Sequence, residues 1–334
     1  MKVFAILLVI LPMTKAQNRT FLQLSDIHLD IKYTEHAYTD RAHFCHKSTD
    51  VDGKGDAAKF GDYKCDAPKV LVESAFLAMK KFVPHPEFIL WTGDSSAHDK
   101  SLNTSEVMQN LKFVTKRLSK LYPGVPIVPV LGNHDSSPAD HFPDSTNAST
   151  PKQSYADYIT DGSFGDLLNA GSEQAEKFKE CGYYVLKNKT YDTNVTQTFI
   201  ALNTALYYHN KAINSSMAPE DPCGQLDWLN RTLQEAKPNE NVFIVAHVPP
   251  GYFEFSADTN YPMFMNEEYT KKYLDIITDK DNAQKVCSTF GEKFSYRIQI
   301  QFYTLFRLWR IFMGIHIQIP SEYSCTKKFI CPLV

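Results

Sequence analysis

The sequence predicts an α/β fold of layered sheets flanked by helices. Short apolar runs rich in β-branched and aromatic residues alternate along the chain with longer segments of helical periodicity. Asp, Asn or His closely follows several of these runs, as is typical of parallel strands whose carboxyl ends line a site. With 334 residues, 43% of them hydrophobic, the chain can bury a sizeable core.

The predicted elements alternate in order along the chain. Five segments have the length and composition of buried strands, and they span 21–24, 88–91, 127–131, 199–202 and 242–246. Four segments have helical periodicity, at 68–82, 105–121, 225–236 and 267–277. Residues 136–179 are rich in Ser, Asp, Asn, Pro and Ala and contain no clear strand, so we expect a helical and loop insertion over the site.

The N-terminus has the pattern of a signal peptide. Lys2 precedes an apolar run at 3–13, and the small residues Thr14 and Ala16 follow, so we expect cleavage after residues 1–16. The run is shorter than the roughly 20 residues that span a bilayer, which disfavours a membrane anchor. We therefore expect a secreted, extracellular or lysosomal protein without a transmembrane segment.

Glycosylation sequons and cysteines also favour a secreted protein. Seven Asn-x-Ser/Thr sequons predict a glycoprotein, and they lie at Asn18, Asn103, Asn147, Asn188, Asn194, Asn214 and Asn230. The seven cysteines should mostly pair in an oxidising compartment, with at least one left over. Cys45 and Cys65 flank a polar, Gly-containing loop and form the preferred disulfide. Cys181 with Cys223 is a second candidate, and a buried free thiol is the alternative for each pair.

Several polar residues that follow the predicted strands can bind metal ions. Asp26 and His28 are one residue apart at a strand end, and since side chains alternate along a strand, both could ligate one ion. The Asp94 carboxylate follows the run at 88–91, and its two oxygens can bridge two ions about 3.5 to 4 Å apart. Asn133 offers a carbonyl oxygen to a second ion, and His247 an imidazole nitrogen.

A structural role is the alternative for each of these residues. An isolated Asp at a strand end is about as often a turn or cap residue, and a lone His is more often structural. Four strand-end sites that carry Asp-x-His, Gly-Asp, Gly-Asn-His and His are hard to obtain from capping preferences alone. The joint pattern therefore favours a metal site.

These motifs resemble the calcineurin-like metallophosphoesterase superfamily and, within it, the acid sphingomyelinase-like phosphodiesterase family. The resemblance extends from about residue 21 to 303 and is carried by SDIHLD, FGDYKCDAP, WTGDSSAHD, LGNHD, DPCGQLDWL and VAHVPPG. It implies a layered β-sandwich and a catalytic domain at 17–303, which we expect to be a monomer. It also implies two zinc ions: one is held by Asp26, His28 and Asp94, and the other by Asp94, Asn133 and His247.

The resemblance also implies roles around the scissile phosphate. His134 is expected to protonate the departing oxygen, and His98 to orient the phosphate or share that role. Asp135 is expected to orient His134. Ala97 occupies the position where purple acid phosphatases have a metal-binding Tyr, which argues for zinc over an iron-tyrosinate site.

The end of the chain departs from the family. A late Gly-His-x-His motif should follow Tyr303, but only His316 is present there. In a shifted reading frame, the codons from Phe312 onward permit Tyr-Gly-His-Thr-His-Thr-Asp, so we interpret residues 304–334 as an out-of-frame tail on an incomplete domain. An amphipathic membrane segment at 302–313 is the rival interpretation. Lacking one imidazole per ion, this chain should bind zinc weakly and have low activity.

These features predict a secreted, zinc-dependent phosphodiesterase. A net charge of −3 and a pI near 6.4 disfavour a nucleic-acid polymer as partner, while small phosphodiesters, nucleotides and phospholipid headgroups fit. One alternative is a sphingomyelin phosphodiesterase that releases phosphocholine. Another is a non-catalytic binding protein that retains the fold, which the missing histidines favour.

Overall fold

The computed structural model describes residues 20–40, 44–46, 55–143, 154–189, 195–208, 221–251, 264–290 and 316–318. The expected signal peptide, the membrane segment considered at 302–313, and the sequons at Asn18, Asn147, Asn194 and Asn214 lie outside these ranges. None of the helices within them is both long and apolar enough to cross a membrane.

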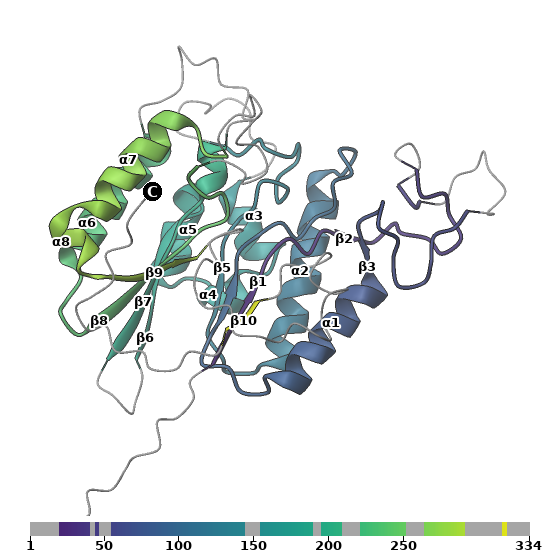
Figure 1. Ribbon diagram of the computed structural model, residues 1–334, viewed down its shortest axis with the longest axis horizontal. Coiled ribbons are helices and arrows are strands. Elements are labelled where there is room, and N and C mark those ends of the chain that lie inside the picture. The colour runs from purple at the N-terminus through teal and green to yellow at the C-terminus, as the bar shows by residue number, and fades with distance from the viewer. Residues whose placement is uncertain are drawn as a thin grey trace, which may run out of the picture.

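Two four-stranded sheets form the centre of the protein (Figure 1). In the first, β1 (Phe21–Leu24), β4 (Ile89–Trp91) and β5 (Ile127–Pro129) run parallel, and β10 (His316–Gln318) pairs antiparallel with β1. In the second, β7 (Thr196–Ala201), β8 (Glu240–Val245) and β9 (Val286–Phe290) run parallel, and β6 (Tyr184–Lys189) is antiparallel to β7.

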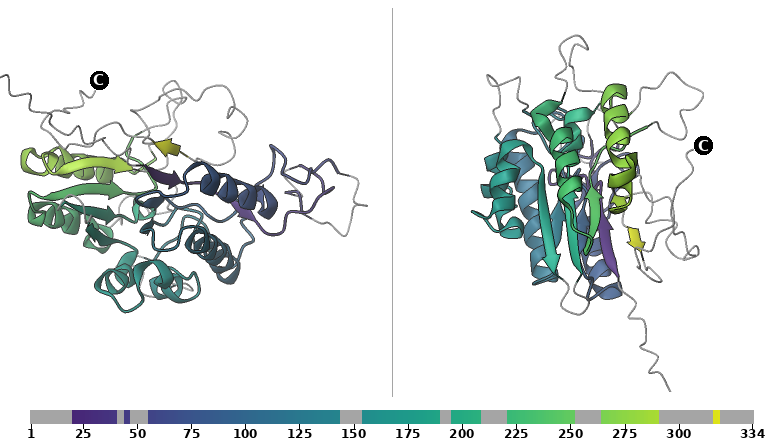
Figure 2. Two further views of the ribbon diagram at one scale, coloured as in Figure 1. Left: turned by 90° about the horizontal axis from the view of Figure 1, so that it is seen from below. Right: turned by 90° about the vertical axis from the view of Figure 1, so that its left-hand side faces the viewer.

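One hydrophobic core joins the two sheets. Phe88, just before β4, has its ring centroid 4.8 Å from that of Phe199 on β7 and 5.8 Å from that of Phe243 on β8. Figure 2 shows the strands as stacked layers with helices on their outer sides. The predicted layered α/β architecture is confirmed.

Helices cover both sheets. α1 (Lys69–Phe82) and α2 (Thr104–Leu121) pack together beside the first sheet, and α6 (Gln225–Glu235), α7 (Glu267–Thr278) and α8 (Lys280–Ala283) lie beside the second (Figure 1). α2 begins at a capping box in which Asn103 and Glu106 bond each other's backbone N–H groups. Its buried face repeats at helical spacing and comprises Val107, Leu111, Val114 and Leu118.

The insertion expected at 136–179 is helical, and no strand occurs in its described part. It contains α3 (Tyr155–Thr160), α4 (Gly165–Leu168) and the start of α5 (Glu173–Cys181). These helices pack into the core through Tyr158, Phe164 and Phe178, and the Phe164 ring lies 5.3 Å from that of Trp91.

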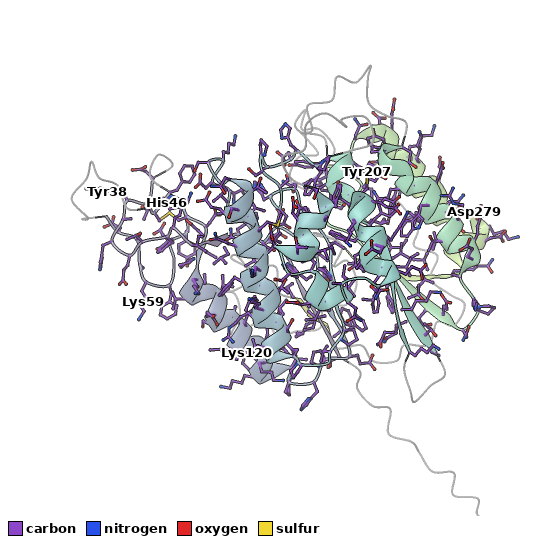
Figure 3. All side chains as sticks on the ribbon, turned by 180° about the vertical axis from the view of Figure 1, so that it is seen from behind. Tyr38, His46, Lys59, Lys120, Tyr207 and Asp279 are labelled. Atoms are coloured by element: carbon purple, nitrogen blue, oxygen red, sulfur yellow. A yellow bond between two sulfur atoms is a disulfide. The ribbon has the colours of Figure 1, made fainter. Side chains whose placement is uncertain are left out.

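Between β2 (Leu29–Asp30) and β3 (Ala67–Pro68), the described residues 31–40, 44–46 and 55–66 project from the side of the molecule and are called the disulfide loop (Figure 1). Cys45 and Cys65, the preferred pair, form a disulfide within it. Tyr38, His46 and Lys59 mark this loop in Figure 3. The second candidate pair, Cys181 and Cys223, is also bonded and ties the end of α5 to the turn before α6.

Three sequon asparagines lie in described residues. Asn103 is exposed at the N-cap of α2, and its side-chain oxygen accepts the Glu106 N–H at 3.1 Å. Asn188 on β6 and Asn230 on α6 are partly buried. The Asn188 amide donates to Gln197 Oε1 at 2.9 Å, and Asn230 Oδ1 accepts from Asn282 at 2.9 Å.

Candidate metal centre

The predicted metal ligands converge from four strand ends. Asp26 and His28 follow β1, Asp94 follows β4, Asn133 follows β5, and His247 follows β8 of the second sheet. Because β1, β4 and β5 are parallel, their carboxyl ends meet at one edge, and β8 brings His247 to the same place.

The expected reason for the pairing of Asp26 and His28 is wrong, although both residues reach the centre. β1 ends at Leu24, and both residues then have left-handed backbone conformations, with φ of 54° and 41°. Such angles cost about 1–3 kcal/mol at a non-Gly residue and need support from neighbours. Asp26 N donates to the Gly93 carbonyl at 3.1 Å, and His28 N to the Asp94 carbonyl at 3.0 Å, so the next ligand loop holds the turn.

Two glycines allow the β4 and β5 loops to approach each other. A Cβ on Gly132 would lie 2.2 Å from both the backbone N and Oδ1 of Asp94, and a Cβ on Gly93 would lie 2.3 Å from Gly132 N. A larger residue at Gly132 would displace the Asp94 carboxylate, and one at Gly93 would displace the backbone of the β5 loop.

Asp94 lies at the middle of the cluster and is 3% exposed. Its Oδ1 accepts the backbone N–H of His134 at 2.8 Å. Its Oδ2 lies 3.6 Å from His28 Nε2 and 3.4 Å from His247 Nε2, while Asp26 Oδ1 is 3.7 Å from His28 Nε2. These separations are longer than good hydrogen bonds and suit donor atoms arranged around shared cations.

Backbone carbonyls orient both imidazoles. His28 Nδ1 lies 2.9 Å from the Ser96 carbonyl oxygen, and His247 Nδ1 lies 2.7 Å from that of Thr92. Because a carbonyl only accepts, Nδ1 carries the proton in each neutral ring, and the Nε2 lone pair faces the carboxylates. Such a contact behind the ring is typical of metal-binding histidines.

The geometry of Asn133 and His247 fits a bound metal ion. The Asn133 amide donates to Asp140 Oδ1 at 2.9 Å, which turns its Oδ1 toward His247 Nε2 at 3.0 Å. Two lone pairs facing each other at this distance repel unless a cation lies with them. A divalent ion fits these two donors.

The electrostatics of the centre also favour cations. Burial lowers the pKa of His28, but Asp26 and Asp94 outweigh it and raise that pKa to about 9. Burial favours a protonated Asp94, yet the neighbouring His247 and His28 hold the pKa of that carboxyl well below its usual range. Asp94 is therefore ionised.

The two predicted catalytic histidines lie beside the ligands. The His98 ring centroid is 4.0 Å from that of His28 and 4.4 Å from that of His134. His134 is half-buried, and burial lowers its pKa to about 4 despite the charge of Asp94. His98 is half exposed and bonded to Asp66. Residue-by-residue reasoning missed Asp66, although it lies in the segment FGDYKCDAP that carries part of the resemblance.

Asp135 does not have the expected role of orienting His134. Its carboxylate accepts three backbone N–H groups, from Asp94 at 2.9 Å, Ser95 at 2.8 Å and Gly132 at 2.9 Å. Burial and the charge of Asp94 together raise the pKa of Asp135 to about 6. The residue thus ties the β4 loop to the β5 loop.

The chain matches known proteins over most of its length. The family model described as calcineurin-like phosphoesterase matches residues 19–279. The human acid sphingomyelinase-like phosphodiesterase 3b is 33% identical over 79% of this chain and 54% of its own length. Sphingomyelinase phosphodiesterase C of Dictyostelium discoideum is 34% identical over 78% of this chain and 56% of its own.

Two further similarities follow. The mouse protein named cyclic GMP-AMP phosphodiesterase SMPDL3A is 33% identical over 77% of this chain and 54% of its own length. A solved purple acid phosphatase from yellow lupin seeds has a TM-score of 0.39 and 11% identity, over 78% of this chain and 35% of the other.

The chain thus spans about half the length of the curated relatives it matches. The family match covers the whole segment from β1 to α7 and includes every predicted ligand at the centre. Metallophosphoesterases use divalent metal ions, in agreement with the donor set found here. The chain belongs to the calcineurin-like phosphoesterase family.

Proposed function

We propose that this protein is a zinc-dependent phosphoric diester hydrolase that cleaves phosphodiester or phosphoanhydride bonds in small substrates. One observation carries the proposal: five donor residues from four strand ends converge, with both imidazoles oriented by backbone carbonyls. Carboxylate, amide and imidazole donors suit zinc, and a shared carboxylate suits a pair of ions.

The residues divide between two sites that share Asp94. Asp26 and His28 complete the first, and Asn133 and His247 the second. When bound, the two ions supply a Lewis acid that activates water and neutralises phosphoryl charge. Asp94 would contribute a carboxylate oxygen to each site, while the backbone N–H groups bonded to Asp135 keep the two ligand loops at a fixed separation.

His134 and His98 complete the proposed machinery. Their rings are adjacent, and both lie beside the His28 ring. We assign to His134 the protonation of the leaving oxygen, and to His98 the orientation of the phosphoryl group or a share in the proton transfer.

The missing Gly-His-x-His motif supports a second candidate, a non-catalytic binding protein that keeps the fold. The sequence contains no such segment, so each ion has one imidazole fewer than the family pattern provides. We accordingly expect weak zinc binding and low activity from this chain.

Zinc content and hydrolysis separate the two candidates. The purified full chain is assayed on bis(p-nitrophenyl) phosphate with added zinc and after chelation, beside Asp94→Asn and a control, Asp161→Asn, at an exposed position. We expect zinc-dependent turnover that Asp94→Asn lowers at least about 100-fold and Asp161→Asn leaves unchanged. Absence of both zinc and turnover would instead establish the binding protein.

Substrate choice needs a second assay. Sphingomyelin in detergent and nucleotide phosphoanhydrides are compared at equal concentration, because relatives carry names of both kinds. We expect the soluble nucleotides to be preferred, and faster release of phosphocholine would favour the sphingomyelinase alternative.

We also propose secretion of a glycosylated chain cleaved after residue 16. Two disulfides support it, since such bonds persist in oxidising compartments. The exposed amide of Asn103 is accessible to a glycan. N-terminal sequencing and glycosidase treatment of the protein from culture medium test both points.

A further inference from the structure

The Asp66 carboxylate makes two hydrogen bonds to His98. Oδ2 accepts the backbone N–H of His98 at 2.6 Å, and Oδ1 lies 2.8 Å from Nδ1 of the same residue. The first bond fixes the backbone, and the second fixes the rotation of the ring and leaves Nε2 as its free nitrogen. His98 needs such a restraint because its side chain is 52% exposed, while that of Asp66 is 18% exposed.

Asp66 is itself held on both sides. Cys65, the preceding residue, is bonded to Cys45. Ala67, the following residue, pairs with Leu29 in the β2–β3 ribbon and donates its N–H to the His28 carbonyl at 3.0 Å. The carboxylate is therefore fixed relative to a metal ligand.

The segment that carries His98 is attached to the same strand. Leu29 forms a bridge with Ser96, two residues before His98, and Leu29 N donates to the Ser95 carbonyl at 2.8 Å. Asp66 and His98 thus approach each other from segments on either side of β2. Their contact depends on the position of the disulfide loop.

The other half-cystine has a matching contact. His46, which follows Cys45, places Nε2 2.7 Å from Oδ2 of the buried Asp30. Each cysteine of the disulfide is therefore followed directly by a residue in a carboxylate–imidazole pair. The loop is attached to the end of β2 by one pair and to His98 by the other.

We propose that Asp66 is the positioning residue of His98 and that the Cys45–Cys65 disulfide anchors it. This inference rests on the proposed phosphodiesterase function and adds to it a group outside the metal ligands. In Asp66→Asn, the new side-chain amide can keep its oxygen on the backbone N–H of His98. Its NH2 group then faces Nδ1 of the His98 ring. The imidazole proton then moves to Nε2, and the ring presents the wrong tautomer to the phosphoryl group.

The experiment compares the full-length wild type with Asp66→Asn, Asp66→Glu and Asp62→Asn. Asp62 is the matched control, since it lies on the same loop and its side chain accepts the Lys64 N–H instead. Histidine-15N NMR of the metal-free proteins, with His98 assigned through His98→Gln, reports the tautomer without any turnover. We expect Nδ1–H for His98 in wild type, Asp66→Glu and Asp62→Asn, and Nε2–H in Asp66→Asn.

Kinetics with zinc and bis(p-nitrophenyl) phosphate provide the second readout. Asp66→Asn should lower kcat about 10–100-fold with little change in KM. Adding Asp66→Asn to the His98→Gln variant should lower kcat little further, because both substitutions act through the His98 side chain. Asp62→Asn should keep the wild-type kcat.

The two ideas can fail separately. A wild type that does not hydrolyse the diester contradicts the proposed function, and the NMR spectra still decide the role of Asp66. If Nδ1 of His98 carries no proton in the wild type, Asp66 is not its positioning residue. An unchanged kcat in Asp66→Asn would overturn the inference as well. If Asp66→Asn does not fold, the wild-type tautomer decides: a proton on Nδ1 of His98 supports the inference, and a proton on Nε2 alone overturns it.

Discussion

At the scale of single residues, the centre depends on groups outside the set of predicted metal ligands. The carbonyls of Ser96 and Thr92 decide which nitrogens of His28 and His247 face inward. The Asp135 carboxylate accepts hydrogen bonds from three backbone N–H groups of the ligand loops. The polar residues that converge at the centre could be predicted from the sequence. These orienting contacts could not, because they join residues from 3 to 155 positions apart.

Gly132 should be as necessary as a ligand. In Gly132→Ala, the new Cβ meets the backbone and carboxylate of Asp94 at 2.2 Å, so the carboxylate must move. We expect a loss of about 1–3 kcal/mol in unfolding free energy, together with weaker zinc binding. Urea denaturation and zinc titration measure the two effects.

Gly124→Ala is the matched control for this substitution. Its Cβ meets nothing within 4 Å, although its φ of +76° costs some stability. Zinc affinity should therefore be unchanged in Gly124→Ala. Equal zinc affinity in Gly132→Ala and wild type would refute the close-approach argument.

At the scale of elements, the long helices follow their sequence signals closely. α2 was expected at 105–121 and spans Thr104–Leu121, because its apolar face and its start are both encoded locally. β6 was not predicted, since most of its residues are half-buried or exposed and its pairing with β7 is set by tertiary structure. The turn at Asp26 and His28 was also missed, because the β4 loop supports it.

The Asp30–His46 pair predicts a pH dependence of stability. The hydrogen bond to Asp30 raises the pKa of His46, although burial opposes it. Because the pKa of His46 is higher in the folded state than its unfolded value of about 6.5, the pair stabilises the fold. This contribution is complete at a pH below about 6.5. This contribution is lost as the pH rises through the folded-state pKa.

Urea denaturation from pH 5.5 to 8.5 tests this pair. His46→Gln should lose more unfolding free energy at low pH than at high pH. His36→Gln is the control, because that side chain is 71% exposed. A pH-independent difference between His46→Gln and wild type would contradict the assignment.

The two disulfides should differ in what they support. They close loops of 20 and 42 residues, so chain entropy predicts a similar loss of about 3–4 kcal/mol when either is replaced by a pair of serines. Only removal of Cys45–Cys65 should also lower kcat at a pH and temperature where both variants stay folded, because that bond anchors Asp66. Equal kcat values in the two double variants would argue against the anchor.

At the scale of the whole molecule, the fold brings His247 from the second sheet to the ligand loops of the first. His247 is fully buried, and it contacts Thr92 and Asn133 from the first sheet's side. The core between the sheets therefore determines the width of the centre. The sequence predicted the layers from alternating strands and helices. The contact between the two sheets follows from packing over long sequence distances.

Anomalous X-ray scattering at the zinc edge, from crystals of the zinc-loaded chain, would locate the metal ions relative to Asp94. We expect two peaks on either side of Asp94, one beside Asp26 and His28 and the other beside Asn133 and His247. Zinc bound elsewhere, or a centre without peaks at zinc concentrations that support turnover, would contradict this expectation.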